Sequence, residues 1–186
     1  NKEKKKELQA MITLFKKGIN NLSPRRFGAM TETMMQNMLH LTNSHNIAYD
    51  KIKGKNRVEI KFSRAYKPLT DVKNNFIKEC EQSVNGRENY SSEECLFHEF
   101  DCNIQQIKRK EFDVLYYGVF FADRIEIYKI RSSNISSIPN YCDIQHRGNN
   151  GEGQFHLTPK TILWHRQNTL FKIISYDELY KLLGGV

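Results

Sequence analysis

The segment VLYYGVFF, residues 114–121, places the strongest constraint on the fold of this chain. Apart from its tyrosine hydroxyls the segment is apolar at every position, so it lacks the alternation of a strand with one face in water. Such a run predicts a central strand that is covered on both faces. The residues Ala122-Asp123 then favour a turn, and the segment that follows, up to Ile130, predicts a second strand.

Helical signals surround this predicted sheet. Apolar residues recur at helical spacing in residues 2–20, and Ser23 followed by Pro24 is a typical helix start. We further expect helices over 70–84 and 94–110, loops over 85–93 and 132–152, a strand pair formed by 154–157 and 170–174, and a final helix from Ser175 to Gly184. The first of these helices has its apolar side at Val72, Phe76, Ile77 and Cys80, and the second is expected to turn Leu96, Phe100, Ile104 and Ile107 inward.

This order of elements predicts an α/β fold of the mixed α+β kind, with a small mixed central sheet flanked by helices. The sequence has no internal repeat and no linker. Its 186 residues therefore predict one domain, 1–186, made of a basic N-terminal helix in 1–21 and a core in 22–183.

The chain is strongly basic. Its 29 Lys and Arg residues exceed its 21 Asp and Glu residues, which gives a net charge of +8. A charge of this sign favours a polyanionic partner, of which nucleic acid is the commonest. An acidic protein or a membrane surface would also fit the charge.

Four cysteines, at 80, 95, 102 and 142, occur without a secretory signal pattern, so we expect reduced thiols in a cytoplasmic protein. Cys95, His98 and Cys102 could be drawn as a zinc site, but they lack the paired spacing of most structural sites, and no zinc is expected. No apolar run approaches the roughly 18 residues of a membrane span, and no membrane partner is expected.

The segment YDKIKGKNRVEIKFSRAY, residues 49–66, predicts a hairpin with Gly54-Lys55 as its two-residue loop. Side chains alternate along a strand, so Glu59 and Lys61 share one face of the second strand. Counting back from the turn, Asp50 lies directly opposite Glu59, with Cβ atoms roughly 5 Å apart. A loop of odd length would turn Asp50 to the other face. The opposite, core-like face of the second strand carries Val58, Ile60 and Phe62.

Two opposed carboxylates repel each other and need positive charge between them. Lys61 supplies one charge, and a divalent cation fits better because carboxylate oxygens suit Mg²⁺, or Mn²⁺ in its place. Such a cation would polarise a phosphate and lower the pKa of a bound water. Lys61 would orient or help deprotonate that water, or stabilise developing charge. Glu32, on a packed face of the preceding helix, could assist the metal.

Asp50, the following gap and Glu59-Ile60-Lys61 resemble the signature of the PD-(D/E)XK nuclease superfamily, to which most type II restriction endonucleases belong. Tyr49 stands where the family name has Pro. The resemblance extends over roughly 22–183 and implies a restriction-endonuclease-like core with magnesium-dependent cleavage that leaves 5′-phosphate and 3′-hydroxyl ends. It implies catalytic roles for Asp50, Glu59, Lys61 and Glu32, and a metal held by Asp50, Glu59 and the backbone carbonyl of Ile60.

The nuclease core uses most of the chain, which leaves little room for a separate recognition domain. The chain therefore resembles the small catalytic subunit of heterodimeric type IIS restriction enzymes. The resemblance implies a bacterial, cytoplasmic protein that binds double-stranded DNA with a larger subunit for recognition and nicking. The candidate DNA contacts are Arg64, Lys67, Lys108 and Arg109.

Two other functions stay open. An autonomous, homodimeric repair or recombination nuclease would use the same carboxylates without a recognition partner. A non-enzymatic DNA-binding accessory protein would use them only for salt bridges to lysine. Dependence on metal separates the accessory protein from the two nucleases, and the shape of the substrate separates the nucleases from each other.

Overall fold

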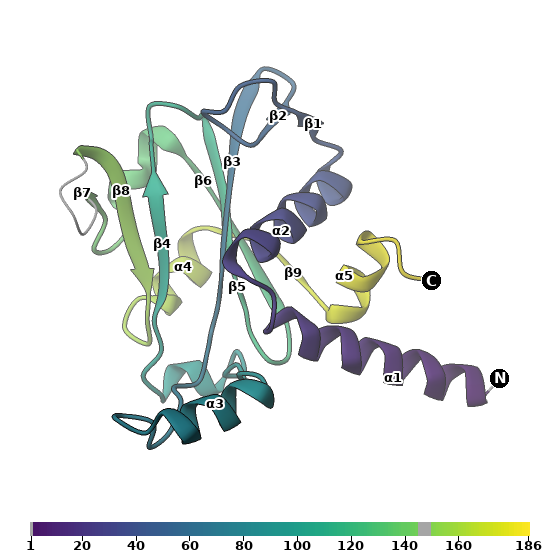
Figure 1. Ribbon diagram of the computed structural model, residues 1–186. Coiled ribbons are helices and arrows are strands. Elements are labelled where there is room, and N and C mark those ends of the chain that lie inside the picture. Colours follow the sequence, from purple (N-terminus) through teal and green to yellow (C-terminus); the bar gives the residue numbers. More distant parts are fainter. Residues whose placement is uncertain (1, 145–149) are drawn as a thin grey trace.

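The computed structural model describes residues 2–144 and 150–186. The positions 1 and 145–149, which include part of the expected loop 132–152, lie outside the described residues. Helices are α1 Lys2–Ile19, α2 Pro24–Leu39, α3 Phe76–Val84, α4 Ile162–Asn168 and α5 Tyr176–Leu182, with 3-10 helices η1 Glu94–Leu96 and η2 Ser132–Ser137 (Figure 1). Strands are β1 Thr42–Asn43, β2 Lys51–Lys53, β3 Asn56–Arg64, β4 Cys102–Ile107, β5 Val114–Phe120, β6 Ile125–Arg131, β7 Cys142–Ile144, β8 Asn150–Leu157 and β9 Leu170–Ile174.

The main sheet has six strands in the order β1-β2-β3-β5-β6-β9, and a second sheet has the order β4-β8-β7. Only the β3–β5 pair of the main sheet is parallel, so the sheet is mixed, as predicted. Every residue of β5 is buried, which confirms a central strand covered on both faces. The predicted β5–β6 hairpin is also confirmed.

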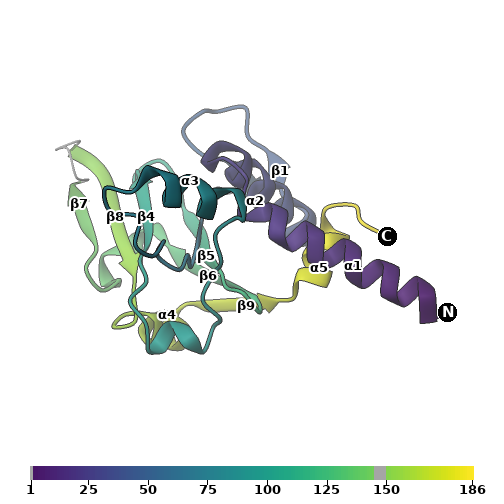
Figure 2. The ribbon, with the colours of Figure 1, turned by 60° about the horizontal axis from the view of Figure 1, so that its bottom comes forward.

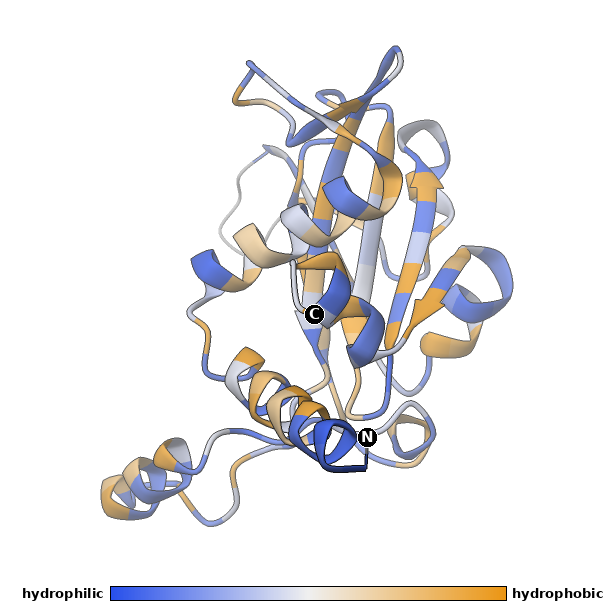
Figure 3. Ribbon diagram, turned by 90° about the vertical axis from the view of Figure 1, so that its right-hand side faces the viewer, coloured by the Kyte–Doolittle hydropathy of each residue, from blue (hydrophilic) through white to orange (hydrophobic). Residues whose placement is uncertain are grey.

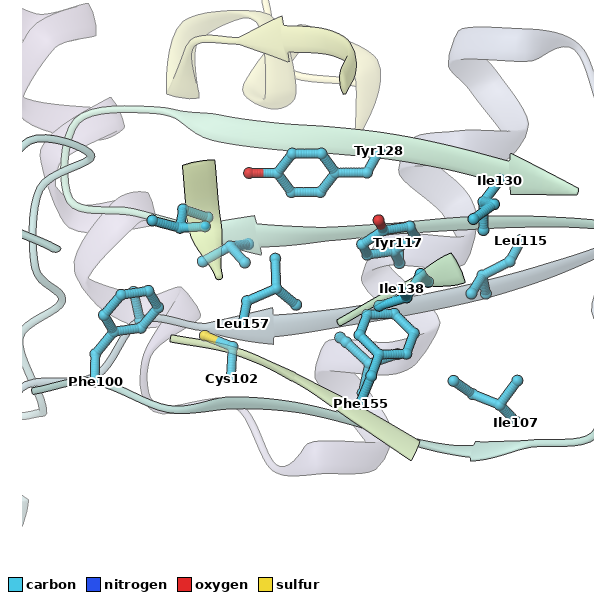
Figure 4. Packing of buried hydrophobic residues seen from close by; sticks show 14 of the residues in the cluster. Phe100, Cys102, Ile107, Leu115, Tyr117, Tyr128, Ile130, Ile138, Phe155 and Leu157 are labelled. Atoms are coloured by element: carbon cyan, nitrogen blue, oxygen red, sulfur yellow. The ribbon is translucent and has the colours of Figure 1, made fainter. Parts of the chain in front are cut away.

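Each face of the main sheet carries its own hydrophobic core. One core joins the sheet to α1, α2 and α5, with Met34, Met35 and Phe120 among its buried residues. The other lies between the main sheet and the second sheet, where the rings of Tyr117 and Phe155 pack edge to face (Figure 4). Figure 2 shows the second sheet at one end of the molecule and α1, α2 and α5 at the other.

Several local predictions are confirmed. The helix 2–20 is α1, Ser23 caps α2 by accepting a hydrogen bond from the backbone N–H of Arg26, and Ser175 caps α5. The β2–β3 ladder has the predicted register, with Lys53 paired to Asn56 and Lys51 paired to Val58. Gly54 in the turn has a φ of +61°, a backbone conformation that glycine adopts without strain.

The helix predicted over 94–110 is wrong, because only η1 is helical there and 102–107 form β4. The misleading signal was the spacing of Ile104 and Ile107, which are both buried. In a regular strand two residues three apart face opposite sides. A bulge between them shifts the register of β4 against β8, so both reach the same core and imitate a helical repeat.

The helix predicted over 70–84 is shorter in the structure, where α3 begins at Phe76. The apolar side of α3 faces solvent, and Phe76 and Ile77 are 78% and 73% exposed. Its attachment is polar instead, because the Gln82 side chain donates to the backbone carbonyl of Thr70 and accepts from its N–H. Figure 1 places α3 at the lower end of the molecule, and Figure 3 shows orange apolar residues on the helix at its lower left.

The C-terminal third differs from the prediction in two ways. Strands β8 and β9, which contain 154–157 and 170–174, belong to different sheets and do not pair with each other. Short elements replace much of the expected loop 132–152, namely η2, β7 and the start of β8. The predicted pair was wrong because two strand-like segments close in sequence were assumed to be neighbours, whereas α4 separates them.

The buried His165 gives the fold a predictable sensitivity to acid. Burial lowers the pKa of its imidazole to about 4, and its Nδ1 lies 2.8 Å from the Tyr117 hydroxyl. The unfolded chain takes up this proton near its ordinary pKa of 6.5. The free energy of unfolding is therefore expected to fall as pH is lowered from about 6.5 to about 4, by about 3 kcal/mol from this residue.

Denaturant unfolding at pH 7.5 and pH 4.5 of wild type and His165→Gln measures this contribution. The wild type is expected to lose more stability than the variant between the two pH values. An equal loss in both proteins would contradict a neutral, buried imidazole in the folded state.

Candidate functional site

Strand β3 sets two charged side chains on one face. Val58 and Ile60 point into the core beneath α1, α2 and α5, so alternation turns Glu59 and Lys61 to the opposite face. The Lys61 Nζ lies 2.8 Å from Glu59 Oε1. Glu59 is only 8% exposed although it is a carboxylate. The prediction that this pair shares one face is confirmed. A carboxylate is rarely buried to this extent, so Glu59 is a candidate functional residue.

Asp50 lies close to Glu59, as predicted, but it is positioned by other hydrogen bonds than the predicted strand pair. The β2–β3 ladder ends at the pair Lys51–Val58, one residue short of the expected Asp50–Glu59 pair. The Asp50 N–H instead donates to the Val58 carbonyl at 3.0 Å. The Asp50 Oδ2 accepts a hydrogen bond from the Ile60 N–H at 2.8 Å, so its carboxylate is anchored on the edge of β3 beside Glu59.

Helix α2 contributes Glu32, which is partly buried in the wall of the same cleft as Asp50 and Lys61. Burial, and secondarily the charge of Asp50, raise the pKa of Glu32. Lys51 and Lys61 act on it in the opposite direction. The structure therefore brings together all four residues predicted to be catalytic, from α2, β3 and the segment before β2.

The electrostatics of this group show an excess of buried negative charge. Burial raises the pKa of Asp50, and burial together with Asp50 and Glu32 raises the pKa of Glu59 to about 7, against the attraction of Lys61. Burial alone would lower the pKa of Lys61, but Glu59 and the other carboxylates raise it overall. Lys61 is thus held as a cation, which favours charge stabilisation over deprotonation of water.

Two clefts meet at these residues. The helix-side cleft, of about 470 Å³, lies between α2, β3 and β4 and includes Glu32. The loop-side cleft, of about 270 Å³, is bounded by residues 47–48, Glu59 and Lys108. Asp50 and Lys61 line both clefts. The charged group is therefore open to a ligand from two sides.

The donor set fits a hard cation. Asp50 and Glu59 supply carboxylate oxygens, and Mg²⁺ is usually held by one or two carboxylates together with water and substrate phosphate. The N–H and C=O of one strand residue face the same side, so the Ile60 carbonyl faces the edge where Asp50 binds the Ile60 N–H. Within 2–144 and 150–186, no three His, Cys, Asp or Glu side chains gather into a metal site made of side chains alone.

The four predicted DNA contacts have different surroundings. Arg64 is partly buried and lines the helix-side cleft, where its Nη1 donates to the carbonyls of Ile19 and Leu22 and its guanidinium lies 4.3 Å from the centre of the Phe27 ring. Lys108 lines the loop-side cleft and forms an ion pair with Glu152.

The remaining two lie outside both clefts. Lys67 forms ion pairs with Glu88 and Glu94, and Arg109 forms one with Asp143. Of the four, the structure brings two to the carboxylates: Arg64 lines the helix-side cleft and Lys108 lines the loop-side cleft.

Sequence reasoning missed Lys51 as part of this site. Its side chain is buried, and its Nζ donates to Gln36 Oε1 at 2.9 Å and to Asn43 Oδ1 at 2.7 Å. Its charge lowers the pKa of Asp50 and of Glu32. The available signal was its place next to Asp50 at the start of a strand, where an inward lysine needs compensating charge.

No family model, no curated protein and no solved structure matches this chain. No helix in the described part of the chain is long and apolar enough to cross a membrane.

Proposed function

We propose that this protein is a magnesium-dependent endonuclease that hydrolyses a phosphodiester of double-stranded DNA. The observation that carries the proposal is the group formed by the buried Glu59 and the partly buried Glu32 and Asp50 beside a lysine held as a cation, where two clefts meet in a protein with net charge +8. Structural ion pairs would need one carboxylate per lysine, and even with Lys51 counted beside Lys61 a third carboxylate is left over. Three carboxylates with raised pKa values are typical of a site that awaits a cation.

The reaction consists of in-line attack of a water oxygen on phosphorus, with cleavage of the P–O3′ bond. The 3′ oxygen leaves with a proton, and the 5′ phosphate keeps the new oxygen. A Mg²⁺ held by Asp50, Glu59 and the Ile60 carbonyl would supply Lewis acidity and lower the pKa of the water. Lys61 stabilises the negative charge that develops on the phosphoryl oxygens. Glu32 holds a water in the helix-side cleft and accepts its proton.

We further propose that a larger subunit supplies DNA recognition and nicks the other strand. Within the 186 residues, the two sheets and their covering helices take up most of the chain, and they carry the candidate catalytic group. Lys108 in the loop-side cleft and Arg64 in the helix-side cleft are the predicted DNA contacts that lie beside the carboxylates, so they would approach a phosphate bound there.

Plasmid cleavage tests this function. Supercoiled DNA is incubated with the protein and Mg²⁺ or EDTA, alone and with a candidate large subunit from the neighbouring reading frame. Metal-dependent cutting that requires the partner is the expected result. Metal-dependent cutting without a partner would point to an autonomous nuclease. Binding to DNA without cutting under every condition would favour the accessory protein.

A further inference from the structure

The bulge in β4 lies beside the candidate site. The register of β4 against β8 shifts between Ile104 and Ile107, and Gln106 between them has a φ of +58°. A non-glycine residue rarely adopts this left-handed conformation, and such residues concentrate at functional sites. Because both isoleucines are buried in the core, the inserted chain turns Gln106 outwards, where its side chain is exposed.

Gln106 lines the same two clefts as two candidate catalytic residues. Asp50, Lys61 and Gln106 are the residues that line both the helix-side and the loop-side cleft. The Gln106 side chain therefore reaches the ridge where the two clefts meet. Its carboxamide makes no hydrogen bond to any residue in 2–144 or 150–186. Two N–H donors and one carbonyl acceptor thus face the site with their bonding capacity unused.

We propose that the Gln106 carboxamide contacts the phosphodiester that is cut and donates an N–H to one of its non-bridging oxygens. This inference rests on the proposed nuclease function. A neutral donor suits the position, because a further cation there would compete with the metal for Asp50 and Glu59. A carboxylate there would repel the phosphate. The bulge thereby connects the second sheet, through one side chain, to the chemistry of the main sheet.

The test is single-turnover cleavage by Gln106→Ala and Gln106→Glu, with Mg²⁺ and any partner that wild type requires. A donor lost from a charged oxygen in the transition state is expected to lower the cleavage rate about 10- to 100-fold in Gln106→Ala. Gln106→Glu is expected to lose more. DNA affinity and Mg²⁺ affinity of Gln106→Ala, measured by titration, are expected to stay within about twofold of wild type. Gln167→Ala, which alters the same side chain on α4 outside both clefts, is the matched control.

Cleavage by Gln106→Ala at the wild-type rate would overturn the inference, as would a loss confined to DNA affinity, which marks a contact to bases or to distant backbone. Gln106→Gly removes the carboxamide and tolerates the left-handed backbone. If Gln106→Ala fails to unfold cooperatively, a shortfall in rate in the folded Gln106→Gly protein supports the contact, and a wild-type rate overturns it. If wild type itself shows no metal-dependent cutting, the proposed function has failed and the role of Gln106 fails with it, whereas a wild-type rate in a folded Gln106→Ala protein overturns the role of Gln106 alone.

Discussion

Replacing Glu59 by Gln is expected to lower magnesium-dependent DNA cleavage by a factor of about 10³ or more while the protein still folds. The substitution keeps the shape of the side chain and removes a charge that stands beside Asp50 and Lys61. Because the pKa of Glu59 is raised to about 7 in the folded state, its ionisation destabilises the fold as pH rises from about 4.5 to about 7. At pH 8 the variant should therefore unfold at an equal or higher denaturant concentration than wild type.

Metal binding provides a second readout for the same substitution. A carboxyl with a pKa of about 7 must lose its proton before it binds Mg²⁺, so the wild-type affinity is expected to rise with pH up to about pH 7. Calorimetry in buffers of different ionisation enthalpy measures the released proton. Glu59→Gln should lose both the affinity and the proton. Equal cleavage by wild type and variant, or a marked loss of stability in the variant, would instead assign Glu59 to a structural salt bridge.

Replacing Glu126 by Ala is expected to lower the free energy of unfolding by about 3–5 kcal/mol. Glu126 is fully buried, and its two oxygens accept hydrogen bonds from Arg124, Arg166 and the Tyr128 hydroxyl. Removing the carboxylate leaves the buried Tyr128 hydroxyl without its acceptor and leaves the Arg166 guanidinium with the Ser92 carbonyl but no carboxylate partner. The melting temperature should fall by about 10 °C for a chain of this size.

Thermal and denaturant unfolding measure this effect. Glu81→Ala, an exposed glutamate on α3, is the matched control and should stay within about 0.5 kcal/mol of wild type. Glu126→Gln keeps an acceptor oxygen and should lie between the two. A loss below about 1 kcal/mol in Glu126→Ala would show that the two arginines find other partners, and that the buried carboxylate contributes little.

The sequence predicted the structure best where a residue pattern is compatible with only one local structure. The unbroken apolar run in β5 requires a covered central strand, and the short turn at Gly54 fixes the hairpin register, which places Glu59 and Lys61 on one face. The position of Asp50 could not be predicted in detail, because its offset bond to Val58 arises where the ladder ends. No local pattern marks that end.

The predictions were wrong where a residue pattern is compatible with two local structures. Ile104 and Ile107 fit a helix as well as a bulged strand, and only pairing with β8 decides between them. Phe76 and Ile77 form a helical apolar face, but periodicity does not say whether another layer is there to receive it. The proposed role of Gln106 could not be predicted for the same reason. It depends on the bulge in β4, which no sequence pattern indicates.

The parallel pairing of β3 with β5 also sets an order of events in folding. The β2–β3 hairpin is local, but β3 finds its other neighbour only after α3, η1 and β4 have been passed in the chain. Such distant contacts form late, because a long loop has to close first. During synthesis, the strand that carries Glu59 and Lys61 has no fixed place until β5 has left the ribosome. The candidate chemistry is therefore expected to be absent from any chain that ends before β5.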